Sequence, residues 1–159
     1  MRSPAVTRSS GEPSKVPPGN HRSTVTTDDL DTRTDVHDLV VSFYREVVFD
    51  DLLAPVFGEV AEVDWARHIP KLIDYWCRVL LGQTGYAGAI IHAHRDVHDI
   101  DPFQVEHFDR WYALWTDSID RRWRGPKADQ AKTHAAHIAA VLSRKLLDVD
   151  WQPPLLDRS

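Results

Sequence analysis

The sequence predicts an all-α protein, and three observations support that prediction. Apolar residues recur at helical spacing along most of the chain, no segment alternates apolar and polar residues for long enough to suggest a strand, and no internal repeat is present. The chain has 159 residues, of which 42% are hydrophobic, enough for one domain with one core. We therefore expect one helical domain, residues 29–150, between two tails.

The two ends of the chain differ in composition from its middle. Residues 1–28 hold four of the ten prolines and no aromatic residue, so we expect a disordered N-terminal tail. Residues 151–159 are expected to form a shorter C-terminal tail. The N-terminal stretch lacks the apolar centre of a secretory signal, and the single cysteine, Cys77, has no partner for an internal disulfide. Together these features predict a cytoplasmic protein.

The first two helices follow from their apolar stripes. Thr34 and Asp35 offer a cap and a first-turn acid, and Asp64 can cap the second helix, which Gly82 ends. Pro70 should confine the regular helix to the residues after it, or kink it. The stripes themselves comprise Val36, Leu39, Val40, Phe43, Val47 and Val48 in the first helix, and Ile69, Leu72, Ile73, Trp76, Val79 and Leu80 in the second.

Two further helices are expected in the second half of the chain. One ends before Gly125 and the other follows it, and a short segment from Ala89 to Pro102 precedes them. Their apolar faces comprise Phe108, Trp111, Tyr112, Trp115 and Ile119, and then Ala131, Ala135, Ile138, Leu142 and Leu146.

Composition excludes two classes of partner. The net charge of −5 gives no overall basic surface for nucleic acid, and no apolar run approaches the roughly 18 residues that a membrane helix needs. The unusual feature is the count of nine histidines. His21 falls in the tail, and four others are expected on the surface: His37, His107, His134 and His137.

The segment before the third helix carries His92, His94 and His98, which suggests a metal site. Zinc needs three or four close ligands, but the chain has neither HExxH nor a CxxC pair. Non-haem iron would need a carboxylate such as Asp96 or Asp99. Haem needs one axial histidine and a large apolar slot, which the aromatic helices could supply. From the residues alone, haem, zinc and no metal all stay open.

The order of these motifs resembles the truncated haemoglobins, and specifically their third group. The likeness runs from about Val36 to Leu146. It is carried by Phe43-Tyr44, residues 53–57 (LAPVF), residues 65–76 (WARHIPKLIDYW), residues 80–82 (LLG), residues 86–88 (YAG), Ala93-His94 and residues 107–111 (HFDRW).

The resemblance implies a truncated globin fold, a two-over-two helical sandwich around haem b. It assigns His94 as the proximal iron ligand, with Tyr44, Trp111 and His68 in the distal ligand pocket. Phe57 would lean on the porphyrin. Further cofactor contacts are expected from Phe43, Leu72, Tyr75 and Trp76, with Lys71 and Arg95 chosen for the haem propionates on charge and placement.

The interval between His94 and Trp111 is longer than the family pattern. Either Val97–Pro102 is an inserted loop or His98 is the ligand, and the gapless match from His68 to His94 favours His94.

Tyr44 and Trp111 are neutral donors that would slow the release of oxygen from such a pocket. We therefore expect an oxygen-binding haem protein that also binds other diatomic gases. Nitric oxide detoxification (a dioxygenase reaction) and peroxidase-like activity are expected besides oxygen transport. Any catalytic cycle would need a separate reductase, since the chain has no GxGxxG motif. A zinc-dependent helical hydrolase using His92, His94 and His98, and a non-catalytic helical interaction module, are the alternatives.

Overall fold

In a computed structural model, the chain folds into five α-helices and one short π-helical turn. The structure describes residues 28–60, 64–83 and 90–154, and no strand occurs among them. The elements are α1 (Arg33–Val47), η1 (Val56–Val60), α2 (Trp65–Leu81), α3 (Ile90–Ile100), α4 (Val105–Asp120) and α5 (Pro126–Leu147). The all-α class predicted from the sequence is confirmed.

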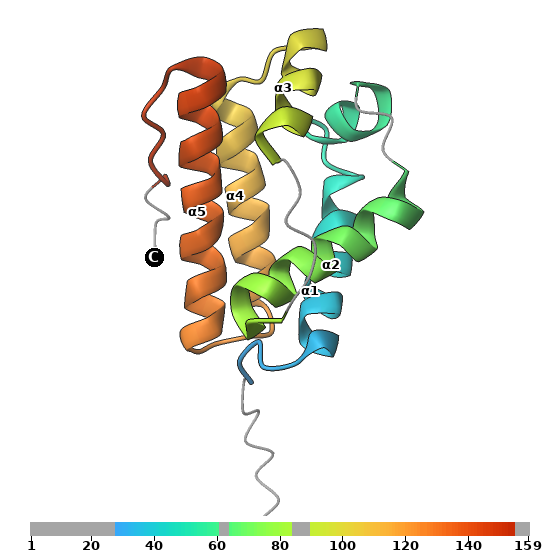
Figure 1. Cartoon of the computed structure of the whole chain (residues 1–159), viewed down its shortest axis with the longest axis vertical. Coiled ribbons are helices and arrows are strands. Elements are labelled where there is room, and N and C mark those ends of the chain that lie inside the picture. Colours follow the sequence, from blue (N-terminus) through green and yellow to red (C-terminus); the bar gives the residue numbers. More distant parts are fainter. Residues whose placement is uncertain (1–27, 61–63, 84–89, 155–159) are drawn as a thin grey trace, which may run out of the picture.

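The helices form two pairs, with α3 at one end (Figure 1). α1 packs against α2, α4 packs against α5, and α1 and α2 also contact α4 and α5 respectively. α3 contacts α5 and η1, but within the described residues it has no close backbone contact with α1 or α2. The core between the pairs is built mainly from apolar side chains of α1, α2, α4 and α5.

Capping residues fix where α1 begins. The Thr32 hydroxyl accepts a hydrogen bond from the Asp35 backbone N–H at 3.1 Å, and the Asp35 carboxylate accepts from the Thr32 N–H at 3.1 Å. This reciprocal pair is a capping box, so the cap is Thr32 and not Thr34 as expected from the sequence.

The start of α5 is tied to the residues that precede α1. The Asp29 carboxylate accepts hydrogen bonds from the backbone N–H groups of Lys127 at 2.9 Å and Ala128 at 2.8 Å. Gly125 has a φ of 141°, and a Cβ there would lie 2.6 Å from the Asp29 side chain. The close approach therefore requires glycine at this position.

Pro70 lies inside α2, so the prediction that regular helix starts only after it is wrong. Its missing N–H removes one bond, to the carbonyl of Ala66, and both residues are exposed, so water can satisfy that carbonyl. The C-terminal segment also packs more closely than expected. Trp151, placed in the tail from the sequence, is buried, and its indole N–H donates to Asp109 at 2.8 Å.

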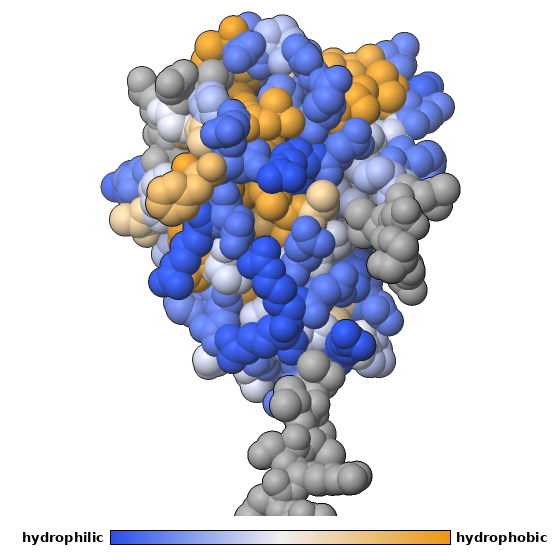
Figure 2. Space-filling view, turned by 180° about the vertical axis from the view of Figure 1, so that it is seen from behind, coloured by the Kyte–Doolittle hydropathy of each residue, from blue (hydrophilic) through white to orange (hydrophobic). Residues whose placement is uncertain are grey.

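The surface away from the view of Figure 1 is mostly hydrophilic in its lower part, and its apolar atoms gather toward the upper end, where α3 and η1 lie (Figure 2). Phe49 and Ile100 are the most exposed of the large apolar side chains described. Within the described ranges, no helix combines the length and apolar character needed to cross a membrane.

Candidate functional site

Four aromatic side chains from three elements meet beside η1. Tyr44 of α1 lies 5.9 Å from Phe57 of η1 and 5.2 Å from Trp65 of α2, measured between ring centroids. Phe57 and Trp65 stack at 5.7 Å, and the His68 imidazole lies 6.1 Å from the Tyr44 ring. The structure therefore brings together Tyr44, Phe57 and His68, three of the residues singled out from the sequence.

The Tyr44 hydroxyl has no hydrogen-bond partner among the described residues. The side chain is half-buried, and the apolar surroundings raise the pKa of the phenol, which keeps it protonated. Buried phenols usually bond a neighbouring group. An unpaired phenol in an aromatic enclosure is thus a donor available to a ligand.

Trp111 of α4 reaches the same region from the other helix pair. Its ring is parallel to that of Trp115, with centroids 6.4 Å apart, and meets the edge of Phe43 at 6.2 Å. Phe43 also contacts Tyr44 at 4.8 Å, so one buried ring supports both polar-tipped aromatics. The indole N–H of Trp115 donates to the Ala131 carbonyl, whereas that of Trp111 has no partner within the part of the chain that is described.

His68 and His94 influence each other electrostatically although their helices stay apart. Burial lowers the pKa of His68, and the charges of His94 and Lys71 lower it further. At neutral pH the His68 imidazole is therefore uncharged. The two imidazoles lie on helices α2 and α3, which have no close backbone contact in the described ranges.

His94 and His98 lie one turn apart on α3, and they differ in their surroundings. The Nδ1 atom of His98 accepts a hydrogen bond from the backbone N–H of Phe103 at 2.9 Å, and its ring stacks on the Phe103 ring at 5.9 Å. His98 thus closes the turn between α3 and α4. His94 is half-buried, with its ring 6.2 Å from Phe103.

The segment after His94 is not an inserted loop throughout. Val97 to Ile100 continue α3, and only Asp101 and Pro102 leave the helix. Most of the residues expected to form an inserted loop therefore belong to the helix that carries His94. The side chain of His92 lies outside the described residues, and those described contain no group of three His, Cys, Asp or Glu side chains placed to hold a metal ion.

The remaining predicted cofactor residues divide into core and surface. Phe43 and Trp76 are buried, and Leu72 is half-buried and packs on the core. Lys71 and Arg95 are both exposed, on α2 and α3.

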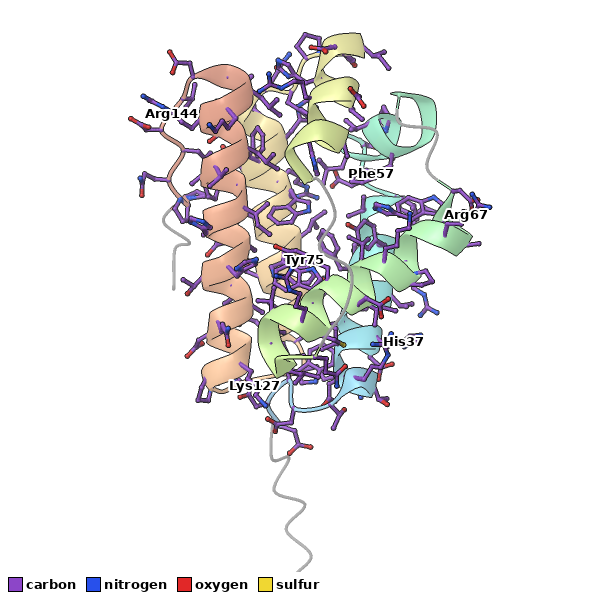
Figure 3. All side chains as sticks on the ribbon, in the orientation of Figure 1. His37, Phe57, Arg67, Tyr75, Lys127 and Arg144 are labelled. Carbon is purple, nitrogen blue, oxygen red and sulfur yellow. The ribbon has the colours of Figure 1, made fainter. Side chains whose placement is uncertain are left out.

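Tyr75 lies at the crossing of α2 and α5 (Figure 3), and its hydroxyl is 2.6 Å from Nε2 of His134. His134 is half-buried, so its expected surface location is wrong. The other histidines are as expected in part: His37 and His137 are exposed, whereas His107 is half-buried.

Two aromatic residues of the site were not predicted. Trp65 encloses Tyr44 and His68, and its spacing of three residues from His68 on one helix was the available signal. Phe103, in the connection between α3 and α4, contacts both His94 and His98 and carried no periodic signal.

Comparison with known proteins gives an independent reading of this arrangement. The chain is 31% identical over 85 residues to the group 3 truncated hemoglobin ctb of Campylobacter jejuni, an alignment that covers 52% of this chain and 65% of that protein. The crystal structure of the group III truncated hemoglobin from Campylobacter jejuni matches with a TM-score of 0.63 and 26% identity, over 72% of this chain and 91% of that one. The chain is thus similar to the third group of truncated haemoglobins in sequence and in fold. No family model matches it.

Likeness to the globins implies haem as the cofactor, and the described residues of this chain fit such a group. Two neutral donors lack protein partners, and both belong to an aromatic cluster beside His68. A half-buried imidazole, that of His94, lies on a helix separated from α2. Haem iron uses one axial imidazole and apolar surroundings that carry hydrogen-bond donors, and this set of residues matches that need.

Proposed function

We propose that this chain binds haem b with His94 as the iron ligand and holds a diatomic gas, dioxygen first, beside Tyr44 and Trp111. The observation that supports the proposal most is the pair of donors without protein partners that rest on one buried ring, Phe43. When bound, haem supplies an iron whose open coordination position takes a small gas. As part of the proposal we keep residues 29–150 as the domain that performs this function and 1–28 and 151–159 as its flanking tails, with Trp151 packed on the domain.

The residues around the pocket have distinct tasks in this proposal. Tyr44 and Trp111 donate hydrogen bonds to the gas ligand, and each bond contributes about 1 kcal/mol net. Neutral His68 adds a third polar group without bringing a charge into the pocket. Phe57 and Trp65 exclude water from the side of η1. Phe43, Leu72, Tyr75 and Trp76 form the wall, with Tyr75 at its outer edge toward α5. Lys71 and Arg95 face solvent where they can pair with the haem propionates.

Two hydrogen bonds to one gas ligand slow its release, and slow release suits a protein that holds the gas better than one that delivers it. We therefore place nitric oxide detoxification and a peroxidase-like reaction ahead of oxygen transport. Electrons for either reaction would come from a separate reductase or a small reductant.

Haem titration of the purified chain tests the proposal. We expect an intense Soret band that saturates at one haem per chain and shifts when the reduced protein meets oxygen or carbon monoxide. Elemental analysis for zinc on the same sample is the control. A chain that gives no Soret band with added haem would refute the proposal, and stoichiometric zinc in its place would favour the hydrolase.

A further inference from the structure

A continuous row of aromatic rings runs from Trp111 of α4 to Tyr75 of α2. The Trp111 ring is parallel to Trp115 at 6.4 Å, and Trp115 stacks on Trp76 at 4.5 Å between centroids. Trp76 in turn meets the edge of Tyr75 at 5.6 Å. Three indoles and one phenol thus connect Trp111 to the crossing of α2 and α5, where Tyr75 lies (Figure 3).

The row ends on a base that can accept a proton. The Tyr75 hydroxyl is 2.6 Å from Nε2 of His134, and the ring of exposed His137 lies 6.4 Å from the His134 ring. Burial raises the pKa of Tyr75 and lowers that of His134. At rest the phenol therefore holds its proton beside a neutral imidazole, and Nε2 accepts the hydrogen bond from the Tyr75 hydroxyl in the tautomer that carries its proton on Nδ1.

This combination of groups suits one-electron oxidation. Indole and phenol side chains are the most readily oxidised aromatic groups in proteins. An oxidised phenol is a strong acid, so the loss of its electron is easiest where a base already accepts its hydrogen bond. Within the described residues Tyr75 has such a base, whereas Tyr112 is half-buried, packs on Trp151 and has no bonded histidine.

We propose that the row Trp111–Trp115–Trp76–Tyr75 carries electrons into the pocket and that the Tyr75–His134 pair is the place where a small phenolic reductant is oxidised. The inference deepens the peroxidase-like part of the proposed function and rests on it. Tyr75 and His134 are half-buried near the surface, so a reductant the size of a phenol can approach them without entering the pocket.

The reaction balances with a hydroperoxide as oxidant. In the pocket its O–O bond breaks, and with two electrons and two protons it gives an alcohol and water. Each electron leaves Tyr75 through Trp76 while the phenolic O–H bond breaks and its proton passes to Nε2 of His134. A phenol from solution then restores Tyr75 by supplying one electron and one proton. His134 releases to solvent the proton that it received, and the two protons used in the pocket come from solvent. Two phenols become two phenoxyl radicals for each hydroperoxide.

The test is to mix the haem-loaded chain with a hydroperoxide, freeze it within milliseconds and record the electron paramagnetic resonance spectrum. We expect a tyrosyl radical that is lost in Tyr75→Phe and kept in Tyr112→Phe, the matched half-buried control. His134→Gln retains a hydrogen-bond acceptor but no base, so it should also lose the signal. A spin trap added to the unaltered chain, followed by mass spectrometry of its peptides, should label Tyr75 and does not depend on the folding of any variant.

The outcomes distinguish a failure of the electron relay from a failure of the proposed haem-binding function. A chain with a Soret band but no tyrosyl radical, a radical that survives Tyr75→Phe, or a trap attached elsewhere would overturn the relay and leave haem binding intact. A chain with no Soret band would overturn the proposed function and the relay with it.

Discussion

Replacing Tyr44 by phenylalanine removes one oxygen atom from the pocket and little else. The ring contacts of Tyr44 with Phe43 at 4.8 Å, Trp65 at 5.2 Å and Phe57 at 5.9 Å do not use the hydroxyl. That hydroxyl has no hydrogen-bond partner among the described residues, so its loss leaves no protein group unpaired. The change therefore isolates the bond between the phenol and the gas ligand.

The size of the effect follows from that isolation. A hydrogen bond between neutral groups contributes about 1 kcal/mol net, which corresponds to about a fivefold faster release of oxygen. Because burial raises the pKa of Tyr44, the phenol stays protonated at neutral pH. The ratio of the two release rates should therefore not vary between about pH 6 and about pH 9. Stopped-flow displacement of oxygen by carbon monoxide measures this rate, with Tyr112→Phe as the control. An unchanged release rate in a Tyr44→Phe chain that still binds haem would contradict the assignment.

Three further predictions concern the second donor and two carboxylates. Trp111→Phe should also speed oxygen release about fivefold, and combined with Tyr44→Phe about 25-fold if the two bonds are independent, measured in the same assay. Asp50→Asn should lower the free energy of unfolding by about 2 kcal/mol in urea denaturation at pH 7, because the buried carboxylate bonds Arg110 at 2.6 Å. Burial opposes ionisation of Asp50, but the bonds from Arg110 and from two backbone N–H groups outweigh burial, so the pKa of Asp50 is lowered. The stability that Asp50 contributes should therefore be present above about pH 4 and be lost as the pH falls through the folded-state pKa. The exposed control variant Asp51→Asn should keep this pH dependence. Asp29→Ala should lower the free energy of unfolding by about 1 kcal/mol, because it removes the carboxylate that caps the start of α5. Urea denaturation should show a lower midpoint with an unchanged dependence of that free energy on urea concentration. An unchanged midpoint would show that the cap contributes nothing.

Periodicity predicted the helices well because most of them bury one apolar face. Val36, Leu39, Val40 and Phe43 recur on one side of α1 and are all buried. It failed where burial depends on a neighbouring helix. The buried face of α5 includes Ala128, Ala131, Ala135 and Ala139, small residues that permit close packing, and His134 beside them is thereby brought against Tyr75 of α2. Nothing in the spacing of α5 distinguishes His134 from a surface histidine.

Of the candidate site, the sequence predicted only the residues that match the family pattern. The resemblance singled out Tyr44, Phe57 and His68, which the structure brings together. Trp65 was missed because its contacts with Tyr44 and Phe57 join different elements, and Phe103 because it lies in a connection that carries no periodic signal. The course of α3 beyond His94 was missed for another reason: Val97 to Ile100 are compatible with helix or loop, and the bond from the Phe103 N–H to His98 closes the helix end only in three dimensions.

The identity of the iron ligand is the central claim, and the Soret band of two paired variants tests it most directly. His94→Ala should abolish the band or reduce it to that of weakly bound haem, and added imidazole should restore it by entering the space left by the side chain. His98→Ala should keep the band and only weaken the turn to α4, since His98 bonds the Phe103 backbone. A band that survives His94→Ala and disappears in His98→Ala would contradict the account.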